Sequence, residues 1–513
     1  MSENTPQEKT EKKGFIQKFA AFGNKFPHPI VLFLWAILVV LVLAWIFNGT
    51  EFTIPGNETP SKITSLFNAA GLQYILTTLF SNFSGMSIVP ILIAMAAAVG
   101  IGEKAGFWEA LIVRCFKNIP DKLLIFLFLF ICINGNLMSD ASLIIFPTLG
   151  AILFQSRKKS PLLGITLAYC GYLGGLSANV LLASTDANVS ALTETAMQTL
   201  DITKNLTITV ASNWFFMAAS AVMLAAVGTF ITLRFVEPAV NKEPNVDWEA
   251  EFDPAALEVT KEQTKGLRAA GIAALVYIAL VLLCVVPKNG ILRNADGGIL
   301  PKSPFMSSIV PLLALLFALL GIVYGKAAKT LTGSTNVIGA AIKGINSITS
   351  ALLAIFVAAQ FNAYLTKTNL ASYIAVSGAN WLKNMNLSGI PTVVALVFFV
   401  MILNIIAGSV SAKWAMISTI VVPMMALLGY HPAYAQCVYR VGDALTNSIN
   451  PIMYYIPMIL AVVRKYKKDA GIGTVIAYQF PYFVAFTIMW TAMLILWFVT
   501  GWPLGPGGPV FIG

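Results

Sequence analysis

Long apolar runs separated by short polar segments make up most of the chain. The first of them is PIVLFLWAILVVLVLAWIF, residues 29–47. A helix needs roughly 20 apolar residues to cross a hydrocarbon core about 30 Å thick. The pattern therefore predicts an all-α polytopic membrane protein with about nine transmembrane helices. These spans are predicted near residues 29–48, 83–101, 161–201, 207–236, 268–287, 306–325, 343–366, 431–463 and 474–500.

Two further apolar pairs have arms that are shorter than a spanning helix. The first pair lies on either side of NGNLMSD (134–140), with basic residues at both outer ends. This pattern predicts a re-entrant hairpin over about 122–156 that opens to the cytoplasm, although two short ordinary spans would also fit. The second pair lies on either side of GSVSAKW (408–414). It predicts a hairpin over about 390–428 that opens to the opposite face.

The basic residues indicate which loops face the cytoplasm. The lysine-rich segment 1–28, the linker 237–267 and the basic loop 464–468 are therefore predicted to be cytoplasmic. Residues 50–80 and 367–388 and the C-terminus are predicted to lie outside, which is the periplasmic or extracellular side.

These assignments divide the chain into two membrane repeats, 29–236 and 268–513, of opposite orientation. In each repeat the hairpin is followed by a long segment that polar residues interrupt. The first such segment is predicted over about 161–201 and the second over about 431–463. Inverted repeats with broken helices are typical of secondary transporters, and their substrate sites lie where the breaks meet.

The composition agrees with this reading. Charged residues make up 11% of the chain and hydrophobic residues 57%, whereas soluble domains average about 25% charged residues. The net charge of +10 comes from basic residues in short loops, so no nucleic-acid partner is expected. An enzyme is not expected either, because the chain has no HExxH motif and only two histidines, each beside a proline. A channel would need a continuous pore instead of two opposed hairpins.

A stripe of polar residues follows the second hairpin. Its members are Gln436, Arg440, Asp443, Asn447 and Asn450, at spacings that place them on one face of a helix. A charge at the bilayer centre costs about 2.5–3.5 kcal/mol by insertion scales, so this stripe must face protein or water. The functional interpretation is that Arg440 binds a substrate carboxylate and Asp443 couples to an ion or proton. Alternatively, Arg440 and Asp443 pair with each other and only hold the helix together.

The matching break in the first repeat contains Asp186. This carboxylate is predicted to take a proton, or to help bind Na⁺ together with Ser184, Thr185 and Asn188. The simpler alternative is that Asp186 caps a helix N-terminus, and the two roles are compatible.

The tips of the two hairpins supply further candidates. Lys413 and Trp414 stand near Ser409 and Ser411, and a tryptophan beside a cation suits an aromatic, anionic ligand. Tryptophan and lysine also anchor helices at the headgroup level, which is the alternative for this pair.

Ser139 and Asp140 are the equivalent residues of the first tip. They are candidates for ion coupling, although Asp140 could simply cap the second arm.

The chain resembles the p-aminobenzoyl-glutamate transporter family (AbgT family) over essentially its whole length. The resemblance is carried by GNKFPHPIVLF (23–33), NFSGMSIV (82–89), MSDASLIIFPTLGA, STDANVSALTETA, NWFFMAASAV, PKNGILR, GIVYGKA, GSVSAKWAMISTIVVPMMALLGYHPAYAQ, YRVGDALTNSINP and GWPLGPG. Matches of this length and number are far more specific than one short motif.

The resemblance implies a homodimeric transporter of the bacterial inner membrane, with nine spans and two re-entrant hairpins per subunit. It implies a small-molecule substrate: p-aminobenzoyl-glutamate, p-aminobenzoate or a sulfonamide. Lipid is the only other expected partner, and no cofactor is expected beyond a coupling ion, H⁺ or Na⁺. Positions that match the proposed pathway residues of the family are Asp186, Asn404, Ser411, Trp414, Arg440 and Asp443. Lys413, Ser409, Asn447 and Asn450 complete the predicted substrate site, and a related Na⁺-coupled carboxylate symporter is the alternative.

Overall fold

The computed structural model describes residues 29–55, 59–86, 88–117, 119–250, 253–299, 303–385, 387–406, 410–451, 453 and 455–512. The predicted N-terminal segment 1–28 lies outside the described residues. The described part is almost entirely helical, and its one sheet pairs two two-residue strands, β1 and β2, in antiparallel fashion. The predicted all-helical fold is therefore confirmed.

The elements up to residue 241 are mostly helices. They are α2 (Pro29–Ile46), β1 (Glu51–Phe52), β2 (Ser61–Lys62), α3 (Ala69–Ser84), α4 (Ile88–Ala105), α5 (Phe107–Lys117), η1 (Asp121–Leu123), α6 (Leu124–Ile133), η2 (Asn134–Ala141), α7 (Ser142–Ser156), α8 (Pro161–Tyr169), η3 (Cys170–Gly174), α9 (Ser184–Met197), α10 (Asp201–Lys204), α11 (Trp214–Ile231), η4 (Thr232–Val236) and α12 (Glu237–Asn241).

The remaining elements are all helical. They are η5 (Pro254–Leu257), α13 (Lys261–Val285), α14 (Pro304–Ala327), α15 (Ser334–Ser347), α16 (Thr349–Lys367), α17 (Leu370–Asn384), α18 (Ile390–Ile406), α19 (Val410–Leu427), α20 (Pro432–Leu445), α21 (Ile456–Tyr466) and α22 (Ile472–Thr500). Among the described residues, seven helical segments are long and apolar enough to cross a membrane, and five shorter apolar helices accompany them.

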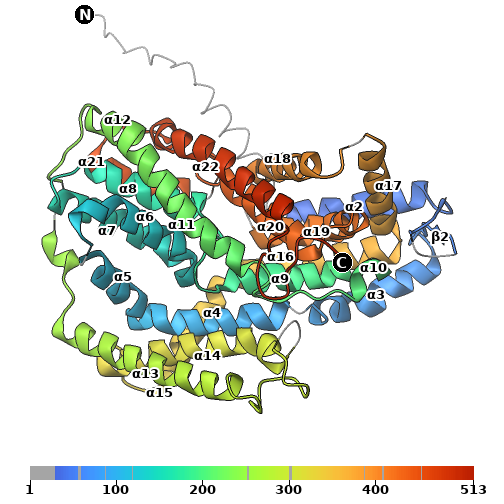
Figure 1. The fold of residues 1–513 in the computed structure, drawn as a ribbon, viewed down its shortest axis with the longest axis horizontal. Helices are drawn as coiled ribbons and strands as arrows, with labels where there is room; N and C mark the ends of the chain where they lie inside the picture. The colour runs from blue at the N-terminus through green and yellow to red at the C-terminus, as the bar shows by residue number, and fades with distance from the viewer. Residues whose placement is uncertain are drawn as a thin grey trace, which may run out of the picture.

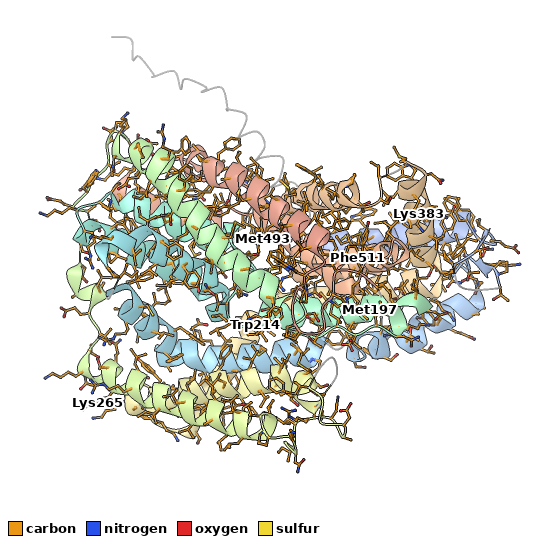
Figure 2. All side chains as sticks on the ribbon, viewed as in Figure 1. Met197, Trp214, Lys265, Lys383, Met493 and Phe511 are labelled. Carbon is orange, nitrogen blue, oxygen red and sulfur yellow. The ribbon has the colours of Figure 1, made fainter. Side chains whose placement is uncertain are left out.

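The long helices run mainly along the longest axis of the molecule (Figure 1). The linker after α12 lies at one end, and the β1–β2 pair and α17 lie at the other. Lys265 and Lys383 mark these two ends in Figure 2. The linker predicted to be cytoplasmic and two of the segments predicted to lie outside, those with the β1–β2 pair and with α17, therefore lie at opposite ends of the molecule.

Two of the segments predicted as outside loops contain helices, α3 and α17. The sequence of α3 carries polar side chains that shorten its apolar run. Asn82 of α3 donates to Gln360 Oε1 of α16 at 2.9 Å, and Gln360 Nε2 donates to the Leu79 carbonyl at 2.9 Å. Polar side chains are tolerated in such a helix because a neighbouring helix satisfies them. A search for long uninterrupted apolar runs misses a helix of this kind.

One side of the molecule is a layer in which α4 packs against α14 and α15, and α13 packs against α14 (Figure 1). Glycines allow the close approach of α4 to α15. A Cβ added at Gly100 would lie 2.5 Å from the Gly344 Cα, and one at Gly344 would lie 2.1 Å from the Ala96 carbonyl oxygen. Small residues at helix crossings are the usual device for close contact between membrane helices.

The centre of the molecule is occupied by α20. All 14 of its residues are buried, and it packs against α9, α18, α19 and α22. No face of α20 is available to lipid, so its polar stripe is enclosed by protein.

Candidate functional site

The first broken helix provides the carboxylate of Asp186. Helix α8 passes into the π-helical turn η3, and the backbone is then irregular until α9 begins at Ser184. Asp186 Oδ2 accepts a hydrogen bond from the Ala183 backbone N–H at 2.7 Å, so the side chain does cap α9. Capping uses one carboxylate oxygen and leaves the other for a second partner.

That second partner is Arg440 of α20. Arg440 Nη2 lies 2.6 Å from Asp186 Oδ1 and donates to the Ser177 carbonyl at 3.0 Å. Ser177 has φ 75°, a left-handed conformation that is uncommon outside glycine, within the break that precedes α9. Arg440 and Asp186 are both buried, and this ion pair joins the two broken segments directly.

Arg440 is only partly satisfied by these contacts. Its Nε and Nη1 atoms have no hydrogen-bond partner within the described part of the chain. A buried donor without a partner costs roughly 1–3 kcal/mol, and more when it is charged. The guanidinium therefore keeps two unused donor atoms in the middle of the protein.

A second buried ion pair lies between the helix pair α18–α19 and α20. Lys413 Nζ of α19 lies 2.6 Å from Asp443 Oδ1, and each side chain is 1% exposed. The Lys413 ammonium also donates to Asn404 Oδ1 of α18. Asn404 Nδ2 donates to the Asp443 carbonyl and to Asn447 Oδ1, both at 2.7 Å. Asn450 Nδ2 donates to the Asn404 carbonyl at 3.0 Å. This network holds α18, α19 and the end of α20 together.

Trp414 lies inside the protein and is 0% exposed. Its ring stacks on Tyr439 with centroids 4.4 Å apart, and its Nε1 donates to Thr193 Oγ1 of α9 at 2.8 Å. Thr193 donates to Gln436 Oε1 at 2.7 Å, and Gln436 Nε2 donates to Asn213 Oδ1 at 2.7 Å. Trp414 is thus part of a buried polar chain that runs from α19 through α9 and α20 to the start of α11.

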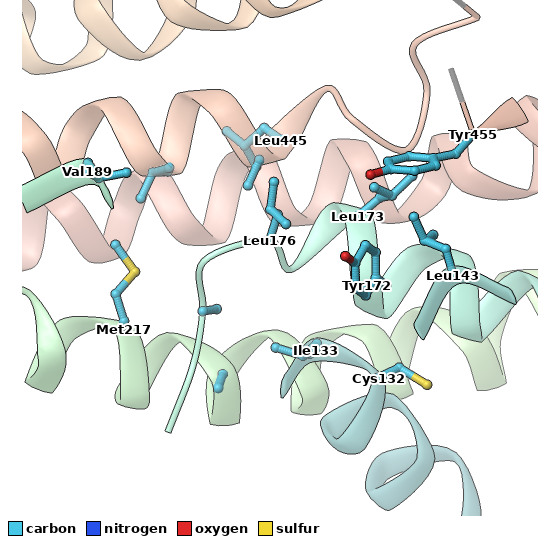
Figure 3. Close-up of a cluster of buried hydrophobic side chains, with 14 of the residues drawn as sticks. Cys132, Ile133, Leu143, Tyr172, Leu173, Leu176, Val189, Met217, Leu445 and Tyr455 are labelled. Atoms are coloured by element: carbon cyan, nitrogen blue, oxygen red, sulfur yellow. The ribbon is translucent and has the colours of Figure 1, made fainter. Parts of the chain in front are cut away.

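A cavity of about 260 Å³ lies beside these networks. Its wall is formed by η2, by the two irregular segments, by the start of α19, and by a facing surface of α4, α15 and α16. Figure 3 shows part of this region, with Tyr172 and Leu173 of η3 close to Leu143 and Tyr455. The two hairpin tips and the two helix breaks, which were predicted to meet at the substrate site, therefore contribute residues to one cavity.

The predicted site residues occupy two different places. Ser411 and Asn188 lie on the cavity wall, together with Ser184 and Thr185. A second group is buried outside the cavity lining: Asp186, Asn404, Lys413, Trp414, Arg440, Asp443, Asn447 and Asn450. Ser409 lies outside the described residues, as do the side chains of Ser139 and Asp140.

The alternative of an internal Arg440–Asp443 pair does not form in this structure. In the described part of the chain, each of the two charges pairs with a residue on another helix instead. Arg440 and Asp443 are three residues apart on α20, a spacing at which two side chains of one helix can pair. The Arg440–Asp186 pair joins the two repeats, whereas the Lys413–Asp443 pair lies within the second repeat.

Several residues of this region are absent from the sequence-based prediction. Thr193, Asn213 and Tyr439 belong to the buried polar chain, and Glu103 and Asn136 line the cavity. Thr193 lies seven residues after Asp186, which places both on one face of α9. That spacing could have identified Thr193, whereas the position of Glu103 on the cavity wall has no local sequence signal.

A helical membrane protein whose two broken helices and two short helix pairs enclose a polar cavity has the architecture of a membrane transporter. Comparison with known proteins agrees. Residues 14–512 match the AbgT putative transporter family. The p-aminobenzoyl-glutamate transport protein of Escherichia coli (strain K12) is 33% identical over 496 residues, which cover 96% of each chain.

Two solved structures are similar over nearly the whole chain. The YdaH transporter of Alcanivorax borkumensis is 31% identical with a TM-score of 0.88, covering 94% of this chain and 100% of that one. MtrF of Neisseria gonorrhoeae, described with a class of antimetabolite efflux pumps, is 36% identical with a TM-score of 0.88, covering 97% and 100%. The chain belongs to the AbgT transporter family, and it is a transporter and not an enzyme.

Proposed function

We propose that this protein is a secondary active transporter of p-aminobenzoate-like aromatic carboxylates, p-aminobenzoyl-glutamate included, and that it exports sulfonamide antimetabolites in a process driven by the proton gradient. The observation that carries this proposal is Arg440, a buried cation next to the cavity wall with two donor atoms that have no partner among the described residues. The substrate class is supported by the similarity to the E. coli p-aminobenzoyl-glutamate transport protein and to N. gonorrhoeae MtrF, which is described with antimetabolite efflux pumps.

The guanidinium of Arg440 suits a carboxylate because its planar donors can hold both oxygens at once. Its partner Ser177 follows Leu176 in the break that leads to Ser184 at the start of α9, and both Leu176 and Ser184 line the cavity. A substrate carboxylate would therefore reach Arg440 through this wall when the break shifts. The cavity of about 260 Å³ is slightly below the 300–1,000 Å³ typical for drug-sized ligands. A single-ring compound fits this conformation best.

Proton coupling follows from the two buried ion pairs. A carboxylate that is paired with a cation holds that cation only while it is ionised. A proton on Asp186 or Asp443 frees Arg440 or Lys413, which lie 2.6 Å away. Import and export use the same groups, so the gradients decide the direction.

A Na⁺-coupled carboxylate symporter is the second candidate, and one observation favours it. Thr185 Oγ1 and Asn188 Oδ1 are buried without a partner in the described residues, and both side chains line the cavity. Oxygen atoms of this kind are suitable ligands for Na⁺, a hard cation. Asp186 lies between them in the sequence and would balance the charge.

The proposal includes location and assembly. We place the transporter in the bacterial inner membrane with the N-terminus in the cytoplasm, because basic residues are concentrated in the segments predicted to face that side. A homodimer is proposed from the family resemblance. Cross-linking in intact membranes would test the dimer, and labelling of single cysteines in the loops would test the orientation.

Counterflow in proteoliposomes is the test of function. Vesicles loaded with p-aminobenzoate, p-aminobenzoyl-glutamate or a sulfonamide are diluted into labelled substrate, under an imposed proton gradient or Na⁺ gradient. Accumulation that responds to the proton gradient alone supports the proposal. Accumulation that responds only to Na⁺ establishes the symporter instead, and the lack of counterflow with all three compounds would refute both.

Arg440→Ala and Trp414→Ala test the assigned residues in the same vesicles. Both variants are expected to lose most transport, Arg440→Ala by loss of the carboxylate partner and Trp414→Ala by loss of the contact between α19 and α9. Arg234→Ala is a suitable control, because Arg234 is exposed and lies beyond the cavity lining. Unchanged p-aminobenzoate transport by both site variants would show that these residues do not form the site.

A further inference from the structure

One cavity residue is unexplained by the proposed transport mechanism. Among the described residues that line the cavity, Glu103 of α4 is the only charged one. Arg440 and Lys413 are buried outside the lining and already paired with carboxylates. The accessible charge in the cavity of a proposed carboxylate transporter is thus negative, which calls for an explanation.

Glu103 does not stabilise the fold in any obvious way. It lies in the last turn of α4, where the helix dipole is negative and an acidic side chain is unfavourable by about 0.3–1 kcal/mol. Its side chain is exposed, and no ion pair or hydrogen bond joins its carboxylate to any other described residue. A carboxylate at this end of a helix, without a partner, is free to accept hydrogen bonds from a ligand.

Glu103 lies at the C-terminal end of the face that α4 contributes to the cavity. The residues of α4 that line it are Leu92, Met95, Ala96, Val99, Gly100 and Glu103. They form one face of the helix, and the 11 steps from Leu92 to Glu103 span roughly 16 Å at 1.5 Å per residue. Apart from Glu103 this face is apolar, so an aromatic ring can lie against it.

Another part of the wall belongs to the first turn of α9 and to the start of α19. Ser184, Thr185 and Ser411 are its polar members, with Arg440 and Lys413 behind it. A ligand with a carboxylate is attracted toward this wall and repelled from Glu103, since like charges in a confined space oppose each other. A ligand with a hydrogen-bond donor at its other end is held by both.

We infer that Glu103 is the specificity-determining acceptor for the aromatic amine at the end of the substrate opposite its carboxylate or sulfonyl group. The inference rests on the proposed function, since it concerns the same cavity. The 4-aminophenyl group is what p-aminobenzoate, p-aminobenzoyl-glutamate and sulfonamides share. Its amine is uncharged near neutral pH because the nitrogen lone pair is delocalised into the ring, and it donates two hydrogen bonds. Glu103 thereby accounts for one transporter that accepts compounds with different groups at the other end.

The test compares two ligands that differ only at the amine. p-Aminobenzoate has two N–H donors, whereas p-(dimethylamino)benzoate has the same carboxylate and none. Each is used as an unlabelled competitor of p-aminobenzoate counterflow in proteoliposomes of the full chain. Glu103→Ala removes the acceptor and Glu103→Gln removes only the charge. Glu109→Gln is the matched control, because Glu109 is an exposed acid of α5 outside the cavity lining.

The wild-type protein is expected to prefer p-aminobenzoate by about tenfold in half-inhibitory concentration, the effect of one hydrogen bond to a charged acceptor. In Glu103→Ala this ratio falls to about one, in Glu103→Gln it is intermediate, and Glu109→Gln keeps the wild-type ratio.

An unchanged ratio in Glu103→Ala, or an equal loss of affinity for both competitors, overturns the inference and leaves the proposed function intact. Absence of counterflow by the wild-type protein overturns both. Because Glu103 is exposed, its variants are expected to fold. A size-exclusion profile like that of the wild type, together with binding of p-(dimethylamino)benzoate, verifies this for each variant.

Discussion

At the scale of single residues, the two buried ion pairs are the most demanding feature of the molecule. Burying two charges costs several kcal/mol of desolvation per ion, which the pair recovers only with good geometry and further hydrogen bonds. The Lys413–Asp443 pair meets both conditions, since Asn404 and Tyr439 also bind its members. Removing one partner leaves the other charge buried and unpaired.

Asp443→Asn is therefore expected to destabilise the protein by about 3–5 kcal/mol. Thermal unfolding of the detergent-solubilised protein measures this. Glu51→Gln is the control, because Glu51 forms an exposed ion pair with Lys62 that is worth about 0–1 kcal/mol. If both variants unfolded at the same temperature, the buried pair would not have the proposed energetic role.

Thr193 offers a second test at this scale, because its hydroxyl links Trp414 to Gln436. Thr193→Val keeps the shape of the side chain and leaves the Trp414 N–H unpaired, at an expected cost of about 1–3 kcal/mol. Thr195→Val on the same helix is the matched control, since the Thr195 hydroxyl bonds only to the Ala191 carbonyl among the described residues. Equal denaturant midpoints for the two variants would contradict the proposed link.

At the scale of elements, the contact between α4 and α15 determines one wall of the cavity. Gly100 and Gly344 allow the two backbones to meet, and Glu103 follows on the next turn of α4. A side chain at either glycine would push α15 away from α4 and alter the wall.

Gly344→Ala is expected to destabilise the protein by roughly 1–3 kcal/mol, because the new Cβ would lie 2.1 Å from the Ala96 carbonyl oxygen. Gly339→Ala on the same helix has no atom within 4 Å and should be neutral or stabilising by about 0.5–1 kcal/mol. Comparing the two unfolding temperatures separates a loss of contact from a change in helix propensity. A stable Gly344→Ala protein would mean that α15 can move without penalty.

At the scale of the whole molecule, the linker after α12 holds parts of both repeats. Gln155 of α7 donates to the carbonyls of Trp248 and Ala250 at 3.0 Å, and the Asp247 N–H donates to the Tyr466 carbonyl at 2.8 Å. Lys467 bonds to the Pro244 carbonyl at 3.1 Å.

Lys467 also lies 2.9 Å from Asp469. This hydrogen bond lowers the pKa of Asp469 below its ordinary value of 3.8. The contact therefore contributes at neutral pH and is lost only as the pH falls through that lowered pKa.

Lys467→Met is expected to loosen the linker without unfolding the membrane helices, because Lys467 is its main contact with the end of α21. Chymotrypsin cleavage after Trp248, which is 41% exposed, should become several-fold faster. Lys468→Met is the control, since the neighbouring Lys468 side chain is exposed and forms no hydrogen bond or ion pair with another described residue. Equal cleavage rates would show that the linker is held by its other contacts.

The sequence by itself determined the helical membrane fold and the position of its irregular segments. Apolar runs and the charges between them depend only on local composition, because lipid requires each spanning segment to satisfy its own backbone hydrogen bonds. The stripe on α20 followed in the same way, since residues at spacings of three and four share a helix face whatever surrounds them. Asp186 and Arg440 were recognisable as candidates on this basis.

Only the tertiary structure decided which charges pair and which residues reach the cavity. Asp186 lies 254 residues before Arg440, and their contact depends on how α9 and α20 are placed and rotated against each other. The packing of distant helices likewise brings Trp414 into contact with Tyr439 and Thr193 and places Glu103 on the cavity wall. Helix periodicity specifies a face but not its neighbour, so contacts between distant helices are a property of the assembled molecule.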